Sequence, residues 1–298
     1  MSYVALVVGW CRRVAGILYR CFLEARPVVQ GIFLLRFLAG ASFAGSLSIG
    51  GAFALWGGAA LWVCVTLSVY ILNGVMDVEE DRINDSSRPV AKGKLTVAQA
   101  ASVAGGLAIL SVVGGFALGD LMGWSVVVAL SLGWLYSGPP FYLKRWPTGL
   151  AVVAILGGLI TFNAGYAANG GGGNHLSFFL FAAMMALWMG LVGQTKDLSD
   201  VEGDKQAGRR SGPVIWGEGV ARLFFSGVAL CLGGGYILAA ALLATSLLIP
   251  ALVLALGAVA VAAITLSSWS RGDKKRLRRP YQAFMLSQYG VNLAVVIW

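Results

Sequence analysis

The stretch NGVMDVEEDRIND, residues 73–85, places five carboxylates and two asparagines in thirteen positions, directly after an apolar run that ends at Ile71 and Leu72. Like charges this close together repel one another. At the end of an apolar helix they also meet the negative end of the helix dipole. A bound cation or a set of basic partners is therefore expected to hold them.

The composition predicts an integral membrane protein. Of the 298 residues, 58% are hydrophobic and 12% are charged, which is too apolar for an ordinary soluble domain. A spanning helix needs about 20 mostly apolar residues. We therefore expect an all-α fold, a membrane bundle of nine transmembrane helices, with cytoplasmic helical loops that cap one end. The nine predicted helices are residues 28–48, 52–76, 97–118, 122–138, 148–168, 176–196, 220–243, 247–267 and 280–298.

Lysine and arginine crowd into alternate loops of this bundle, as expected from the positive-inside rule. They precede the first predicted helix and follow the second, fourth, sixth and eighth. The loops near 49–51, 119–121, 169–175 and 244–246 carry none. The pattern predicts a multi-pass protein of the cell membrane with a cytoplasmic amino terminus and an external carboxy terminus.

The basic segments outside the bundle indicate contact with lipid. Residues 1–27 combine basic and apolar side chains without a small-residue cleavage site, which favours a retained helix at the membrane surface. The transmembrane domain would then be residues 28–298. The net charge of +9 and the run RGDKKRLRR at 271–279 suit anionic lipid head groups better than nucleic acid.

The acidic residues form an internal repeat. Nine of the thirteen lie in 77–85 and 197–204. Shifting the chain by 123 positions superimposes DVEED at 77–81 on DVEGD at 200–204. Each copy lies at the predicted cytoplasmic end of an even-numbered helix, so the sequence repeats one kind of site.

Helix geometry gives each copy an acidic face. Asn73, Asp77 and Asp81 are spaced four residues apart, as are Asp200 and Asp204, so the side chains of each set lie on one side of a helix. A divalent cation removes the repulsion within each set. Oxygen ligands without histidine or cysteine favour magnesium, which commonly bridges carboxylates to phosphate oxygens. Two metal clusters and a ring of basic residues would hold a strongly anionic group such as a diphosphate.

Two other interpretations of the acidic windows are open at this point. In the first, the acids are solvated loop residues that pair with Arg82, Arg88, Lys205 and Arg209, as charge clusters at membrane faces usually are. Alternatively, the protein is a cation transporter whose acids bind the transported ion. Transport sites usually lie near the bilayer midplane, whereas these windows lie at helix ends.

Three segments resemble the UbiA superfamily of intramembrane prenyltransferases. The segment NGVMDVEEDRINDSSRPVAKG, 73–93, resembles the first aspartate motif of that family, NxxxDxxxD. KDLSDVEGDKQAGRRS, 196–211, resembles the second, and YSGPPFYLKR, 136–145, resembles the segment after the fourth helix. All three occur in the order of that family, which also has nine helices. Gly74 stands where many members carry a second acidic residue.

The resemblance implies a magnesium-dependent prenyltransferase. Such an enzyme moves an isoprenoid chain from an allylic polyprenyl diphosphate to a hydrophobic or aromatic acceptor, for example a quinone precursor, and releases diphosphate. The active site would lie under the cytoplasmic cap. The alternative is a terpene cyclase of the same family, which needs no acceptor.

The resemblance also assigns residues. Two Mg²⁺ ions would be held by Asn73, Asp77, Asp81, Asp197, Asp200 and Asp204. Diphosphate would be bound by Arg88, Lys144 and Arg209. Tyr136 would line the cavity beside the reacting carbon, so the expected catalytic set is Asp77, Asp81, Asp200, Asp204 and Tyr136.

Apart from Lys196 and Arg222, which lie near the ends of their predicted helices, Arg36 is the one basic residue inside a predicted membrane helix. An arginine at this depth usually faces the bundle interior and marks a site, so it is a further candidate for binding diphosphate. The alternative is that its long side chain reaches back to the cytoplasmic surface.

Overall fold

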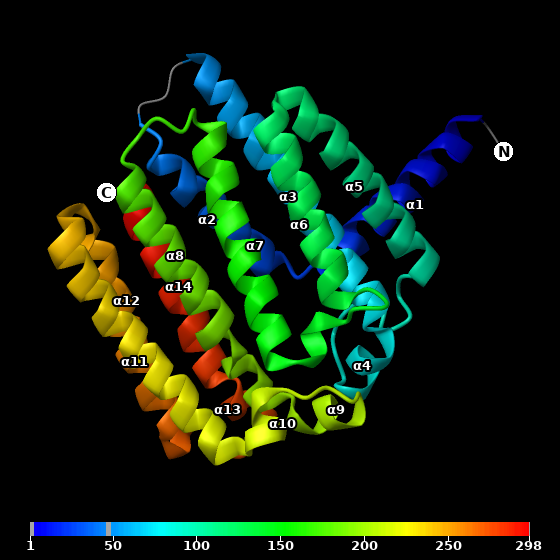
Figure 1. Ribbon diagram of the computed structural model, residues 1–298. Coiled ribbons are helices and arrows are strands. Elements are labelled where there is room, and N and C mark those ends of the chain that lie inside the picture. Colours follow the sequence, from blue (N-terminus) through cyan, green and yellow to red (C-terminus); the bar gives the residue numbers. More distant parts are fainter. Residues whose placement is uncertain (1–2, 46–48, 298) are drawn as a thin grey trace.

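The computed structural model describes residues 3–45 and 49–297, and the regular structure of these residues is entirely helical (Figure 1). The end of the first predicted helix, 46–48, and residues 1, 2 and 298 lie outside the described part. The long helices are α1 (Tyr3–Glu24), α2 (Pro27–Ser42), α3 (Ile49–Met76), α5 (Val97–Leu118), α6 (Asp120–Ser137), α7 (Pro147–Ala168), α8 (His175–Leu191), α11 (Glu218–Leu243), α12 (Leu248–Leu266) and α14 (Arg279–Ile297). The short helices and 3₁₀ turns are α4 (Val78–Ile83), η1 (Leu143–Arg145), η2 (Val192–Ser199), α9 (Val201–Gln206), α10 (Gly212–Trp216), η3 (Thr245–Leu247), η4 (Ser268–Ser270) and α13 (Lys274–Leu277).

The all-α prediction is confirmed, and each of the nine predicted ranges matches one long helix from α2 to α14. Within the described residues, seven helical segments are long and apolar enough to cross a membrane: α3, α5, α6, α7, α8 continued by η2, α11, and η3 continued by α12. The helix α2 has only 16 residues, and α14 is not among the seven. The membrane bundle is therefore established, while a count of nine spanning helices stays a prediction.

The sixth predicted helix ends earlier than expected. It was expected to reach residue 196, but α8 ends at Leu191 and the chain continues as the 3₁₀ helix η2. Polar side chains bond to the local backbone here: Gln194 donates to the carbonyl of Gly190 at 2.8 Å and Thr195 to that of Val192 at 2.8 Å. Such bonds compete with regular α-helical geometry.

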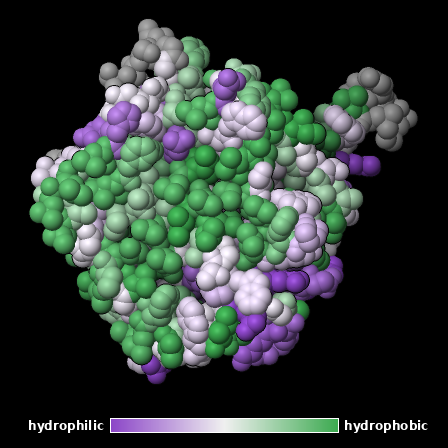
Figure 2. Space-filling model, in the orientation of Figure 1, coloured by the Kyte–Doolittle hydropathy of each residue, from purple (hydrophilic) through white to green (hydrophobic). Residues whose placement is uncertain are grey.

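The flank of the bundle is apolar. In Figure 2, hydrophobic side chains cover much of the visible side, and hydrophilic ones gather toward the two ends. The helix α1 extends away from the bundle (Figure 1) and exposes large apolar side chains such as Trp10, 64% exposed, and Tyr19, 63% exposed. This exposure suits the surface helix predicted for residues 1–27, whose place at the membrane stays a prediction.

The short elements α4, α9, α10 and α13 lie together at one end of the bundle, opposite the end at which α14 finishes (Figure 1). Local sequence fixes the helices that lead there. The side chain of Thr96 caps α5 in a reciprocal pair with Gln99. Pro27 and Pro147 begin α2 and α7 at the first-turn position that proline favours.

A reciprocal glycine contact brings α2 and α7 close together. A Cβ atom built on Gly40 would collide with the backbone carbonyl of Phe162, and one built on Gly165 would collide with that of Phe37. Small residues allow such close approach between membrane helices. The two glycines thus set the distance between α2 and the centre of the bundle.

Replacing Gly165 with alanine is expected to destabilise the folded bundle by about 1–3 kcal/mol, because the added methyl group must push α2 and α7 apart. The thermal midpoint in detergent measures this effect. Gly157→Ala is the matched control on the same helix, because a Cβ at Gly157 meets nothing within 4 Å. Equal midpoints for the two variants would contradict the contact.

Candidate active site

The two acidic windows begin with the same interruption of the helix. Asp77 lies in a turn between α3 and α4 with φ −101° and ψ 13°. Asp200 lies between η2 and α9 with φ −121° and ψ 12°. Four residues later, the N–H groups of Asp81 and Asp204 donate to the carbonyls of these two residues, each at 2.8 Å. The expected continuous helices are thus broken at the first aspartate of each motif, in the same way in both copies.

The two short helices also end alike. The backbone turns left-handed at Asp85, φ 49°, and at Gly208, φ 69°. In each copy the N–H of the next residue donates at 2.8 Å to the carbonyl of the second motif aspartate, Asp81 or Asp204. This is the Schellman ending of a helix. The 123-residue repeat therefore extends from the side chains to the backbone conformation.

Arg209 joins the two windows. Its Nη1 lies 2.9 Å from Glu80 Oε1 in the first window and 3.1 Å from Asp204 Oδ1 in the second. Its Nη2 lies 3.9 Å from Asp197 Oδ1. The side chain is only 7% exposed, so α4 and α9 are linked through a buried guanidinium.

Lys144 reaches the first window from η1, directly after α6. Its Nζ contacts Asp77 Oδ1 and lies 3.4 Å from Glu80 Oε2. Asn73 Nδ2 donates to Asp77 Oδ2 at 2.9 Å and to Ser137 Oγ at 2.7 Å. The segment after the fourth predicted helix and the first acidic motif thus form one cluster.

Arg88 is saturated by protein acceptors. Its Nη1 donates to Asp81 Oδ2 at 3.0 Å and to Asn73 Oδ1 at 3.2 Å. Its Nη2 donates to the carbonyl of Tyr70 at 2.6 Å, and its Nε lies 2.8 Å from Glu24 Oε1. The structure therefore brings Arg88 to the first motif, where it holds metal-ligand candidates in place; its predicted contact with diphosphate stays a prediction.

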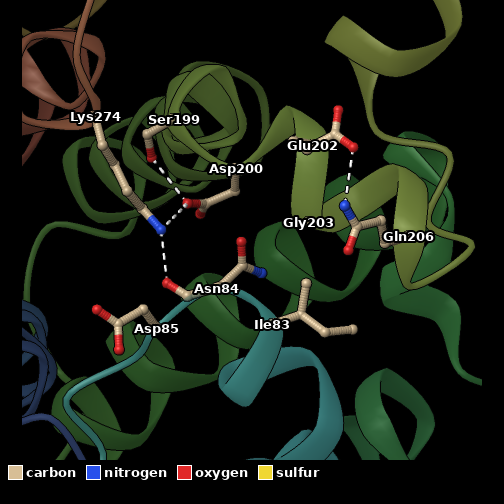
Figure 3. A pocket seen from close by; sticks show the side chains of 9 residues that line it. All are labelled: Ile83, Asn84, Asp85, Ser199, Asp200, Glu202, Gly203, Gln206 and Lys274. Carbon is tan, nitrogen blue, oxygen red and sulfur yellow. Dashed lines mark hydrogen bonds and ion pairs between the residues drawn. The ribbon is translucent and has the colours of Figure 1, made fainter.

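Asp200 faces away from the Arg209 cluster. Figure 3 shows it lining a cavity of about 290 Å³ between the two windows, close to Lys274. Lys274 Nζ lies 3.9 Å from Asp200 Oδ1 and donates to the carbonyl of Asn84 at 2.7 Å. Ser199 Oγ donates to Asp200 at 3.1 Å. Asp200 and Asp204 thus lie on the same short segment but contact different cations.

A second cavity, of about 270 Å³, opens beside the Lys144 and Arg209 side chains. Arg145 also lines it, together with Glu80 and Gln206. Three basic side chains in its lining suit a small anionic group. The volume lies just below the range of about 300–1,000 Å³ for sites that enclose whole organic ligands.

Two predicted residues lie apart from these contacts. Tyr136, at the end of α6, is half-buried and close enough to Arg209 to influence its pKa. Arg36 is buried within the bundle, donates to Gln288 of α14 and stacks over the ring of Phe33 at 4.9 Å. The side chain therefore stays inside, as expected for a membrane arginine, but its described contacts are with α14 rather than with the acidic windows.

Burial shifts the ionisation of the cluster. It raises the pKa of the Asp204 carboxyl to about 6, against the opposing effect of Arg209. It lowers the pKa of the Lys144 ammonium to about 7, and the Arg209 charge contributes to the decrease. Although burial acts in the other direction, Asp197 and Asp204 raise the pKa of Arg209. The charges are therefore held in a water-poor environment by their partners.

The donor groups fit magnesium. In the described part of the chain no three acidic side chains come together as a ready-made metal site, and the carboxylates contact lysine and arginine instead. However, both oxygens of Asp197 and Oδ2 of Asp204 are buried without a hydrogen-bond partner, and Asp197 Oδ1 has only the longer ion-pair contacts with Lys196, at 3.4 Å, and Arg209, at 3.9 Å. Buried carboxylate oxygens require a partner, and hard oxygen donors are those that magnesium prefers.

Sequence reasoning missed two acidic members of the cluster. Glu80 bridges Lys144 and Arg209, and Glu24 binds Arg88. Glu80 lies within the first acidic window, 73–85, but no role was predicted for it. Glu24 is the single acid in residues 1–27, which was the available signal.

Solved structures share the fold. The structure of a UbiA homolog from Archaeoglobus fulgidus bound to GPP and Mg²⁺ superimposes with a TM-score of 0.68 at 20% identity, covering 94% of this chain and all of the other. An apo structure of a UbiA homolog from Aeropyrum pernix gives 0.66 at 19% identity, with 89% and 96% covered.

Similar sequences carry the names of prenyl-transferring enzymes. A probable homogentisate phytyltransferase 2 of Oryza sativa is 30% identical over 48% of this chain and 40% of its own length. The homogentisate phytyltransferase of Synechocystis is 30% identical over 48% and 49%. A digeranylgeranylglyceryl phosphate synthase of Halobacterium salinarum is 35% identical over 53% and 56%. The matches span about half the length of these relatives.

The family model described as the UbiA prenyltransferase family matches residues 33–288 and so covers most of the chain. The matched range contains both acidic windows, the Lys144 segment and all seven apolar helices. This multi-pass membrane protein therefore belongs to the UbiA prenyltransferase family.

Proposed function

We propose that this protein is a magnesium-dependent prenyltransferase that moves an isoprenoid chain from an allylic polyprenyl diphosphate to a hydrophobic or aromatic acceptor and releases diphosphate. The observation that carries the proposal is the pair of matching acidic turns joined by Arg209, with Lys144 beside them. GPP and Mg²⁺ in the Archaeoglobus homolog, and the prenyl-transferring names of the relatives, support this donor and metal.

The acidic residues would divide into two metal-binding groups. Asn73, Asp77 and Asp81 would hold one ion, and the second window the other. Bound magnesium supplies Lewis acidity where negative charge develops on the diphosphate as the allylic carbon–oxygen bond breaks. The second group comprises Asp197, Asp200 and Asp204.

The basic residues would bind the donor. Lys144 and Arg209 line the cavity of about 270 Å³ and lie next to carboxylates of both windows. They present fixed positive charge to the diphosphate oxygens in a poorly solvated site, where such charge acts strongly. Tyr136 would lie near the reacting carbon, and the isoprenoid tail would extend among the apolar helices.

We further propose that this end of the bundle faces the cytoplasm and that the carboxy terminus lies outside. The arginine and lysine distribution supports this orientation. The arrangement agrees with it, since α4 and α9 lie at one end and α14 finishes at the other (Figure 1). The exposed α1 and the basic run 271–279 would contact membrane lipid.

The product assay tests this function. Purified protein in detergent is given geranyl, farnesyl or geranylgeranyl diphosphate and Mg²⁺, with and without pools of aromatic and lipid acceptors. The products are identified by mass spectrometry. A prenylated acceptor whose formation tracks diphosphate release is the expected result. Acceptor-independent release with a cyclic product would show a cyclase, and Mg²⁺ or Na⁺ flux in liposomes without release would show a transporter.

Replacing Lys144 with methionine is expected to raise the KM for the donor by about tenfold or more, because one charged contact with an anionic group is lost. Donor binding should be weakened more than the stability of the folded bundle, which the thermal midpoint measures. Lys205→Met is the control, since Lys205 is an exposed lysine of α9. An unchanged donor KM in Lys144→Met would contradict its role.

A further inference from the structure

Glu24, at the end of α1, is a completely buried carboxylate next to the first acidic motif. The end of α1 is fixed to the bundle because Cys21 and Ala25 pack in an apolar cluster with Ile71 of α3 and Ala104 of α5. The position of Glu24 is therefore set by the same packing that holds the helix leading to Asn73.

Both oxygens of Glu24 contact the segment that follows the first motif, Oε1 through an ion pair and Oε2 through a hydrogen bond. Oε1 lies 2.8 Å from Arg88 Nε, and Oε2 accepts the backbone N–H of Val90 at 2.8 Å. Arg88 Nε also donates to the main-chain carbonyl of Glu24 at 3.2 Å. One residue of α1 thus fixes both the guanidinium and the backbone beside it.

The space for this carboxylate exists because residue 74 is glycine. A Cβ atom at Gly74 would collide with Glu24 Oε1 and would lie 2.6 Å from Arg88 Nη2. The Glu24 carboxylate therefore occupies the volume that a side chain at position 74 would fill. An acidic side chain at residue 74 would meet the same guanidinium.

We propose that Glu24 is a positioning residue for the first metal-binding group, acting through Arg88, and this inference rests on the proposed function. Arg88 is shared between Glu24 and Asp81, and its Nη1 also donates to the side-chain oxygen Oδ1 of Asn73. A guanidinium that is partly neutralised by Glu24 competes less strongly with magnesium for Asp81. Its fixed orientation also holds the side-chain oxygens of Asn73 and Asp81 next to the same guanidinium nitrogen, Nη1.

The test uses four variants: Glu24→Gln, Glu24→Ala, Gly74→Asp, and Glu24→Ala combined with Gly74→Asp. Mn²⁺ binding to the purified full-length protein, followed by electron paramagnetic resonance, gives a readout without turnover. The thermal midpoint and the Mg²⁺ concentration that gives half-maximal diphosphate release are measured beside it. Glu218→Gln is the control. Glu218 also pairs with a buried arginine, Arg222 at 2.8 Å, but it lies outside both acidic windows.

Glu24→Gln is expected to weaken Mn²⁺ binding and to raise the required Mg²⁺ concentration by about 10–100-fold, as loss of a group that orients metal ligands does. Gly74→Asp alone is expected to impair binding by collision. The double variant should bind Mn²⁺ within about threefold of the wild type, because the Gly74→Asp substitution supplies a carboxylate beside Arg88 in place of the one removed at Glu24.

Two results would overturn the proposal. One is wild-type Mn²⁺ binding in Glu24→Gln. The other is Mn²⁺ binding that falls across the variants in proportion to their thermal midpoints and does not recover in the double variant. A wild-type protein that binds Mn²⁺ in a Glu24-dependent manner but turns over no donor would contradict the proposed function alone. An active wild type with an unaffected Glu24→Gln would contradict the inference alone.

Discussion

Asp77→Asn is expected to reduce the rate of diphosphate release by about 10²–10³-fold while leaving the bundle folded. The substitution keeps the shape of the side chain but removes its negative charge. Asp77 is the residue at which the first acidic helix is interrupted, and its oxygens contact Lys144 and Asn73. Loss of the charge removes a metal ligand and leaves Lys144 without one of its two carboxylates.

The rate is measured at saturating donor over a range of Mg²⁺ concentrations, with circular dichroism to check folding. Asp85→Asn is the matched control: it lies in the same window, is 89% exposed at its side chain and pairs with Lys92 at 2.5 Å. Asparagine also tolerates the left-handed backbone at this position. A rate for Asp77→Asn within threefold of the wild type would contradict the metal role.

The second large effect is expected for Arg209→Met. This change leaves the carboxylates of Glu80, Asp204 and Asp197 without their shared cation. Removing one partner from a buried ion pair commonly costs about 3–5 kcal/mol. We expect a lower thermal midpoint in detergent and a donor KM raised by at least about tenfold.

A double variant separates the two consequences. Adding Asp204→Asn to Arg209→Met removes one uncompensated charge and should restore part of the thermal midpoint, but not donor binding. Arg210→Met is the control, because Arg210 is exposed and stacks over Trp146 at 4.7 Å. Full recovery of both stability and donor KM in the double variant would contradict both the donor-binding role of Arg209 and the metal-binding role of Asp204.

The sequence predicted the membrane bundle well because long apolar runs have few alternative structures. The fifth range, 148–168, for example, differs from α7 by one residue at its start. The repeat of DVEED and DVEGD also predicted two sites of the same kind at the ends of two helices. Their interruptions at Asp77 and Asp200 were not predicted, because periodicity alone cannot distinguish a continuous helix from a turn that keeps the i to i−4 bonds.

The partners of the charged residues could not be read from the sequence. Arg88 is surrounded by acceptors contributed from α1, α3 and α4, which the sequence did not predict, while its expected contact with the substrate stays a prediction. Glu24 lies 64 positions before Arg88 in the chain, and only the packing of α1 brings them together. Similarly, Asp200 follows the same spacing rule as Asp77 but contacts Lys274 of α13. Such pairings depend on how the helices pack against one another.

The central claim is that the two acidic windows bind one prenyl diphosphate through magnesium. The most direct measurement is calorimetric titration of purified protein with a non-cleavable thiolodiphosphate analogue of geranylgeranyl diphosphate, with Mg²⁺ and with a chelator. We expect binding that requires Mg²⁺ and that is lost in both Asp77→Asn and Asp204→Asn. Binding of equal affinity with the chelator, or in both variants, would contradict it.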